Sequence, residues 1–270
     1  MKNILEAPFM VETVRTLTNL YRLGWDERNG GNLSYRILPE ELEGYVDTDA
    51  VIRTIPMSFD ASEISGMVFL VTGTGKYFKN VQYDPAKNLG LIKISADGKN
   101  AELLWGFSDG GRFTSELPAH LMSHIVRLGI DKESRVVMHT HPTNTIAMSL
   151  IHSLSERDFT RTLWQMQTES IVVFPEGVSV LPWMVCGTND IGIATAEKLR
   201  ESRLCVWAAH GIYGVGKDLD EAFGLIETVE KAAQLYMLSV NAGIKNGITD
   251  DQLKDLAAVF GLNYNKAYLD

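Results

Sequence analysis

Cysteine is nearly absent from this chain, which has only Cys186 and Cys205 among its 270 residues. Two cysteines without C-x-x-C spacing are too few for a disulfide framework, so we expect free thiols in a reducing compartment. We expect both side chains to pack and not to react. Long apolar runs are also missing, since no stretch approaches the roughly 20 apolar residues that a membrane-spanning helix needs.

Basic residues are scarce relative to acidic ones. The chain has 25 Lys and Arg against 34 Asp and Glu, which gives a formal charge of -9. Nucleic-acid binding depends on neutralising many backbone phosphates, so this balance argues against a nucleic-acid partner. The first residues lack the apolar core and the small-residue cleavage site of a secretory signal. We therefore expect a soluble cytoplasmic protein without a membrane partner.

No internal repeat, low-complexity tract or Pro/Gly/Ser linker divides the sequence. With 45% hydrophobic residues, the chain can bury a sizeable core. Residues 38–66 are polar, irregular and acidic, and we interpret them as an excursion from that core. The prediction is one domain over residues 1–270.

Short apolar runs separated by turns predict strands at about 67–72, 89–94, 102–107, 135–141, 169–174 and 203–210. The runs at 91–94 and 103–105 flank a polar turn and indicate a hairpin. Helical spacing predicts an N-terminal helix over 10–23, a long helix over 218–236 and a last helix over 249–261. Because regular βαβ alternation is missing, we expect an α/β fold with a mixed, mostly antiparallel central sheet flanked by helices.

The sequence His139-Thr140-His141, at the end of an apolar run, is the motif that most clearly indicates a functional site. Side chains at i and i+2 of a strand share one face, so His139 and His141 are able to bind one ion. His210 closes the apolar run at 203–210. If the two strands lie close together, three neutral imidazoles hold a divalent cation and leave open the coordination position that catalysis requires.

Other interpretations of the histidines stay open. His139 and His141 also fit ordinary strand-end histidines that bond to backbone. Glu116, His120 and His124 share one helical face and form a rival set of metal ligands. A structural zinc site is a third alternative, although such sites usually have four protein ligands and this pattern offers three.

Two glycine-containing loops offer hydrogen-bond donors to an anion. Residues 29–34 (Asn-Gly-Gly-Asn-Leu-Ser) precede a predicted strand, and 72–76 (Thr-Gly-Thr-Gly-Lys) follow one. Both fit an anion-binding nest, with a plain Asn-Gly turn as the alternative for the first. Neither 72–76 nor 211–217 completes a nucleotide-binding fingerprint, and we interpret 211–217 as a glycine-rich turn leading into a capped helix.

Two glutamates are candidates for acid-base chemistry. Glu116 falls at a predicted helix start, with Pro118 in the first turn, and is also typical of a solvated first-turn glutamate. Glu169 precedes the apolar run at 171–174 and is either a second acid/base or an exposed strand-start charge, which is the simpler interpretation.

These segments resemble the class II, metal-dependent aldolases of sugar phosphates over nearly the full length of the chain. The resemblance rests on residues 24–33, 71–76 and 114–120 and extends to 173–177 and 181–185. It implies a class II aldolase-like fold, with one zinc per subunit bound by His139, His141 and His210. It also implies that Glu116 is catalytic.

The same resemblance places the substrate phosphate at Asn29, Asn32, Thr74, Gly75 and Ser115, with Thr74 at a serine-like position of the family. It implies cleavage of a small sugar phosphate to dihydroxyacetone phosphate and an aldehyde. It further implies a homotetramer, in which Glu169 reaches a neighbour's site. The alternatives are a fuculose-phosphate aldolase, a ribulose-phosphate 4-epimerase, a dehydratase or a non-catalytic adducin-like module. The three histidines and Glu116 argue against the last.

Overall fold

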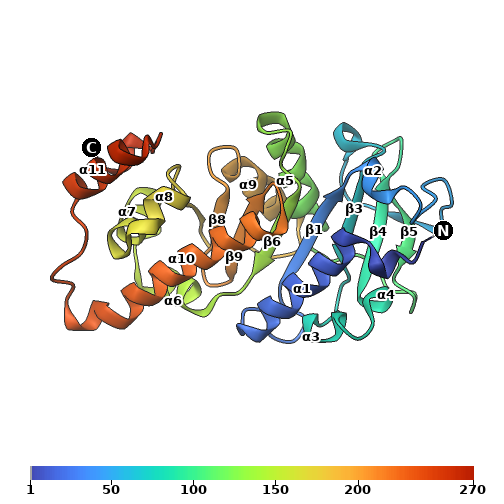
Figure 1. Ribbon diagram of the computed structural model, residues 1–270, viewed down its shortest axis with the longest axis horizontal. Helices are drawn as coiled ribbons and strands as arrows, with labels where there is room; N and C mark the ends of the chain where they lie inside the picture. The colour runs from blue at the N-terminus through green and yellow to red at the C-terminus, as the bar shows by residue number, and fades with distance from the viewer. Residues whose placement is uncertain (1) are drawn as a thin grey trace.

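A nine-stranded sheet forms the centre of the molecule in the computed structural model, which describes residues 2–270 (Figure 1). The strands are β1 (Asn32–Ile37), β2 (Arg53–Pro56), β3 (Val68–Thr72), β4 (Leu89–Ile94), β5 (Asn100–Gly106), β6 (Val136–Thr140), β7 (Ser179–Leu181), β8 (Leu204–Trp207) and β9 (Gly211–Gly216). Their order is β2-β5-β4-β3-β1-β6-β9-β8-β7, and only the β7/β8 pair is parallel. The predicted mixed, mostly antiparallel sheet is confirmed.

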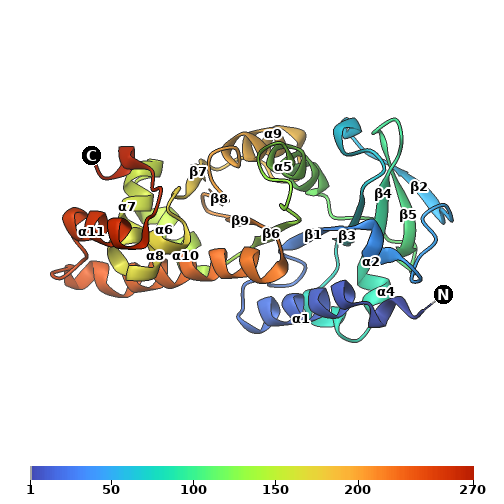
Figure 2. The same cartoon turned by 45° about the horizontal axis from the view of Figure 1, so that its top comes forward.

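Helices cover both faces of this sheet (Figure 2). One face is covered by α1 (Pro8–Arg22), α10 (Leu219–Ser239) and the short α3 (Phe78–Val81) and α4 (Pro85–Asn88), the other by α5 (Leu117–Ile130) and α9 (Asn189–Lys198). Strand β6 is buried on both sides, with Val136 and Met138 in the core on the α10 side and Val137 in the core on the α9 side. Because side chains alternate, His139 points to the same side as Val137.

The remaining helices gather around the far end of α10, opposite the N-terminus (Figures 1 and 2). They are α6 (Thr143–Ile151), α7 (Glu156–Met166), α8 (Thr168–Val173) and α11 (Asp250–Phe260), while α2 (Pro39–Leu42) lies near the other end. No helix within residues 2–270 combines the length and apolar character needed to cross a bilayer.

The predicted helices at both ends of the chain are confirmed. Gly24 follows α1 with φ +77°. Asp218 caps α10 by accepting a hydrogen bond from the backbone N–H of Glu221. Thr249 forms a capping box at the start of α11, and Gly261 ends that helix in the left-handed conformation. The predicted hairpin is the β4/β5 pair.

The predicted strand at 169–174 is wrong, because these residues form most of α8. Ser170, Ile171 and Phe174 are buried whereas Glu169 is exposed, which is helical spacing. A continuous apolar run does not distinguish a buried strand from a short buried helix. Ile171 and Phe174 join the core beside α10, so packing decides the conformation.

The prediction for 203–217 is partly wrong. Strand β8 ends at Trp207, so His210 lies in the turn between β8 and β9. Residues 211–216 form β9 and not the expected glycine-rich turn. Glycine serves close packing here, since a Cβ at Gly214 would lie 2.7 Å from Ile226 of α10, and one at Gly216 would lie 2.6 Å from a backbone nitrogen of α10.

Residues 38–66 are joined to the core more closely than expected. They supply β2 at the edge of the sheet, where it pairs with β5. Ile55 and Ile64 from this segment are buried in the core on the α5 side.

Candidate metal centre and active site

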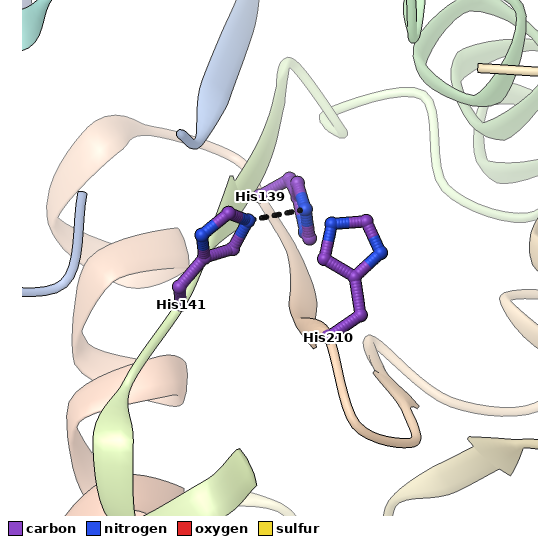
Figure 3. Close-up of side chains that lie close together, drawn as sticks. All are labelled: His139, His141 and His210. Atoms are coloured by element: carbon purple, nitrogen blue, oxygen red, sulfur yellow. Dashed lines mark hydrogen bonds between the residues drawn. The ribbon is translucent and has the colours of Figure 1, made fainter. Parts of the chain in front are cut away.

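Three imidazoles converge beside the end of β6 (Figure 3). His139 is the fourth residue of β6, His141 follows the strand by one residue, and His210 comes from the β8/β9 turn. Strand β9 pairs with both β6 and β8, which brings the two segments together. One ring nitrogen from each histidine lies within 4.8 Å of the others.

Hydrogen bonds define which ring nitrogens face the centre of this cluster. His139 Nδ1 lies 3.1 Å from the carbonyl oxygen of Ile212, and His141 Nδ1 lies 3.1 Å from both carboxylate oxygens of Glu27. Both Nδ1 atoms therefore carry the hydrogen and both Nε2 atoms present a lone pair. The two Nε2 atoms face each other at 3.3 Å, as the dashed line in Figure 3 marks.

This arrangement fits a bound divalent cation. Two facing lone pairs repel each other, and a cation between them removes the repulsion. Nitrogens bound tetrahedrally to one ion at roughly 2.1 Å stand about 3.4 Å apart, close to the observed separation. Burial and the neighbouring imidazoles hold the pKa of His139 well below its usual value, and burial lowers the pKa of His210 to about 4. His139 and His210 are thus neutral near pH 7, as coordination requires.

The loop before β1 supports the end of β6. The Thr140 hydroxyl donates to the buried carboxylate of Asp26 at 3.0 and 3.1 Å, and the backbone N–H of His141 donates to the carbonyl of Trp25 at 2.7 Å. Gly31 adopts φ +72°, and a Cβ there would lie 1.7 Å from Asp26 Oδ1. Only glycine fits this close approach.

Glu116 places a carboxylate next to the imidazoles. It is the N-cap residue of α5, is 8% exposed, and has Oε2 3.6 Å from His139 Nε2. Its Oε1 lies 4.0 Å from His210 Nε2. Burial raises the pKa of Glu116, against the opposing effect of hydrogen bonds from Asn32 Nδ2 at 2.8 Å and the Tyr213 hydroxyl at 3.2 Å. A carboxyl group with a raised pKa beside a metal site is suited to proton transfer.

The residues expected at the substrate phosphate line one cleft together with Glu116, His141 and His210. They are Asn29, Asn32, Thr74, Gly75 and Ser115. Asn29 lies in the turn before β1 and Asn32 is the first residue of β1. Thr74 and Gly75 come from the loop after β3, and Ser115 from the entry to α5. A larger cavity of about 750 Å³ beside α2 borders none of the three histidines.

In the structure, two other sets of residues that the sequence suggested for the site lie apart from the three-histidine cluster or bond elsewhere. Glu169 is exposed in the first turn of α8 and does not line this cleft. The rival set of Glu116, His120 and His124 does not form a ligand cluster among residues 2–270, because both histidines bond to the Ser34 hydroxyl under the sheet.

The two cysteines have different environments. Cys205 is buried, as expected, and burial raises the pKa of its thiol. The expectation that Cys186 packs is wrong, since it is exposed. Its sulfur lies within 4.8 Å of a carboxylate oxygen of Glu116 and a ring nitrogen of His210.

Sequence reasoning missed Tyr213 and Glu27. Tyr213 is fully buried, stacks on His139 with ring centroids 4.4 Å apart, and bonds to Glu116. It lies on β9, which was interpreted as a turn, so its direction was not predictable. Glu27 lies in the segment that carries the family resemblance, but its contact with His141 depends on the loop conformation.

The mixed sheet, the three-histidine cluster and the adjacent Glu116 are features of one class of enzyme. Comparison with known proteins leads to the same class. The family model described as Class II Aldolase and Adducin N-terminal domain matches residues 11–237. The chain belongs to this family.

Whole-chain relatives make the likeness more specific. The rhamnulose-1-phosphate aldolase of Listeria innocua is 59% identical over 270 residues, covering 100% of this chain and 99% of the relative. The rhamnulose-1-phosphate aldolase of Yersinia pseudotuberculosis is 45% identical, and the match covers 100% of this chain and 100% of the relative. A crystal structure of a sugar-phosphate aldolase from Thermotoga maritima is 30% identical, with a TM-score of 0.74, and covers 87% of this chain and 95% of its own.

Proposed function

We propose that this protein cleaves L-rhamnulose 1-phosphate reversibly to dihydroxyacetone phosphate and L-lactaldehyde, as a carbon-carbon lyase of rhamnose catabolism. The geometry supports this through one observation above all: the Glu116 carboxylate lies 3.6 Å from His139 Nε2, a nitrogen of the three-histidine cluster that could hold a metal ion. The relatives that match the whole chain at 45–59% identity are rhamnulose-1-phosphate aldolases. Three L-fuculose 1-phosphate aldolases among the structural neighbours are 18–23% identical and support the fold alone.

The proposed cofactor is one Zn²⁺ per chain, held by His139, His141 and His210. As a Lewis acid, a bound divalent cation would stabilise the negative charge left on the substrate when the C3–C4 bond breaks. Three protein ligands leave a coordination position for substrate, which a closed structural site with four ligands does not.

Glu116 is the proposed proton donor. In cleavage, the electron pair of the C3–C4 bond stays on C3 and the C4 hydroxyl loses its proton as it becomes the aldehyde. Glu116 gives a proton to C3, and in the reverse direction it removes that proton. Hydrogen bonds from Asn32 and Tyr213 hold the carboxylate in place.

The substrate phosphate is proposed to bind where five residues line the cleft: Asn29, Asn32, Thr74, Gly75 and Ser115. Their amide, hydroxyl and backbone N–H groups suit a small anion. Gly75 adopts φ +68°, and the structure leaves the space around its Cα open. A phosphate there lies next to the metal histidines, because the same cleft contains His141 and His210.

We further propose that residues 1–270 act as a single domain within a homotetramer. The unbroken sheet supports the first statement. The second follows the family resemblance, and association would bury the large apolar side chains of Trp183, Val185, Leu150 and Ile151, each of which is more than half exposed. In the tetramer, Glu169 of one copy would serve a neighbouring site as the acceptor of the C4 hydroxyl proton.

The test is a comparison of substrates in the zinc-loaded enzyme. We expect dihydroxyacetone phosphate and L-lactaldehyde in equal amounts from L-rhamnulose 1-phosphate, with kcat/KM at least about 10-fold lower for L-fuculose 1-phosphate. Glu116→Gln should keep its zinc and lose at least about 100-fold in kcat. A stereoisomer or a dehydrated product in place of the two fragments would instead identify an epimerase or a dehydratase.

A further inference from the structure

A chain of buried polar side chains runs from Glu116 into the layer between the sheet and α5. Asn32 Nδ2 lies 2.8 Å from Glu116 Oε2, and Asn32 Oδ1 bonds to His120 Nε2. His120 Nδ1 lies 2.8 Å from the Ser34 hydroxyl, which lies 2.9 Å from His124 Nε2. All five residues are buried, and both histidines are fully so.

In this series of hydrogen bonds, every donor hydrogen points toward Glu116. Because the Asn32 amide donates to Glu116, its carbonyl oxygen accepts from His120 Nε2–H. His120 Nδ1 is then an acceptor and takes the Ser34 hydroxyl hydrogen, so Ser34 accepts from His124 Nε2–H. His124 Nδ1 is left without a hydrogen, and it is also the one nitrogen of the two histidines that has no partner.

The arrangement in which every donor hydrogen points away from Glu116 is unfavourable for two reasons. It would place a hydrogen on His124 Nδ1, a buried donor without an acceptor, which costs more than an unpaired acceptor. It would also turn the Asn32 carbonyl oxygen toward the carboxylate of Glu116, where two acceptors meet. Burial keeps both histidines neutral by lowering the pKa of His120 to about 3 and that of His124 well below its usual value.

We propose that His120, Ser34 and His124 are positioning residues of the active site, which fix the orientation of the Asn32 amide and thereby of Glu116. The inference rests on the proposed function, in which Glu116 transfers the proton. Asn32 then has two tasks, since its amide nitrogen holds Glu116 and the residue also lines the cleft in which the phosphate is proposed to bind. Without these hydrogen bonds, the Asn32 amide is free to turn over and to present its oxygen to Glu116 and to the phosphate in place of its nitrogen.

Variants that interrupt or preserve the chain test this proposal in the zinc-loaded enzyme. Ser34→Ala breaks it in the middle and His124→Leu removes its terminal donor, and we expect kcat to fall about 10- to 100-fold in each, with unchanged zinc content. His124→Gln should remain within about threefold of wild type, because a glutamine amide nitrogen can replace Nε2–H. Ser123→Ala is the matched control, since Ser123 is a fully buried serine of α5 that bonds only to Ala119 and should leave kcat unchanged.

Nitrogen NMR of ¹⁵N-histidine-labelled protein gives a readout independent of activity. We expect the Nε2–H tautomer for both His120 and His124, and a mixture of tautomers for His120 in Ser34→Ala. An Nδ1–H tautomer for either histidine in the wild type, or equal kcat in Ser34→Ala and Ser123→Ala, would overturn the proposal. If the wild type cleaves no sugar phosphate, the proposed function fails, while the tautomers still decide whether the chain has the stated direction.

Discussion

Neutral, buried histidines dominate this site at the scale of single residues. His120 is fully buried and its pKa is lowered to about 3, whereas an unfolded histidine titrates near 6.5. Below pH 6.5 the unfolded chain therefore binds a proton that the folded chain does not. The stability of the folded chain that depends on neutral His120 is fully present above pH 6.5. It is lost as the pH falls toward 3, because the unfolded chain binds the proton more tightly than the folded chain does.

We therefore predict that the free energy of unfolding of metal-stripped protein decreases between pH 6.5 and 4.5. His120 contributes about 1 kcal/mol per pH unit to this decrease. Urea unfolding at several pH values measures it, and His120→Gln should give a shallower pH dependence. Parallel curves for wild type and variant would show that His120 is protonated in the folded state.

The residues whose role follows from local spacing were predictable. His139 and His141 are two positions apart and His210 closes another apolar run, and the resemblance then grouped all three with Glu116. Tyr213 was not predictable, because its contact with Glu116 depends on the pairing of β9 with β6. The link from His120 and His124 to the site depends in the same way on Ser34 lying beneath α5, which no spacing in the sequence reveals.

At the scale of elements, Glu230 of α10 anchors the start of α6. Its carboxylate accepts hydrogen bonds from the backbone N–H of Asn144 and Thr145 at 3.0 and 2.8 Å, and from both of their side chains. Because α6 begins two residues after His141, this contact connects α10 to the three-histidine cluster.

Glu230→Ala should lower the free energy of unfolding by about 2–4 kcal/mol, because it leaves buried donors without an acceptor. Denaturant unfolding measures the effect. Glu227→Ala, an exposed change in the same helix, serves as the control and should change stability by no more than about 0.5 kcal/mol. Equal effects of the two substitutions would mean that Glu230 does not anchor α6.

Elements with clear end signals were predictable, and those decided by packing were not. The cap at Asp218 and the glycine at Gly261 mark their helices in the sequence. The α8 segment has the apolar run of a strand and folds as a helix against α10. Strand β9 contains three glycines, which normally indicate turns. They are needed here because the start of α10 lies too close to Gly214 and Gly216, and the end of β6 too close to Gly211, for a side chain to fit.

At the scale of the whole molecule, the position of Glu169 leads to a prediction about assembly. It lies on α8, among the helices at the C-terminal end, and does not line the cleft of its own chain (Figure 1). If it serves a neighbour, mixing Glu116→Gln and Glu169→Gln subunits should restore sites that contain both glutamates.

Random reassembly of equal amounts would restore about a quarter of wild-type activity, since a site needs one subunit of each kind in a set arrangement. Each variant taken alone through the same dissociation and reassembly is the control. Mixed activity no greater than the average of the two variants would exclude a shared site.

The proposed function requires metal-dependent cleavage of one sugar phosphate by Glu116 and the three histidines at the end of β6. The most direct measurement is the initial rate of dihydroxyacetone phosphate release from L-rhamnulose 1-phosphate, before chelation, after chelation and after zinc is restored. We predict at least about a 100-fold loss on chelation and recovery of most of the rate with one zinc per chain. An unchanged rate in fully metal-stripped protein would show that cleavage does not depend on a metal bound by the three histidines.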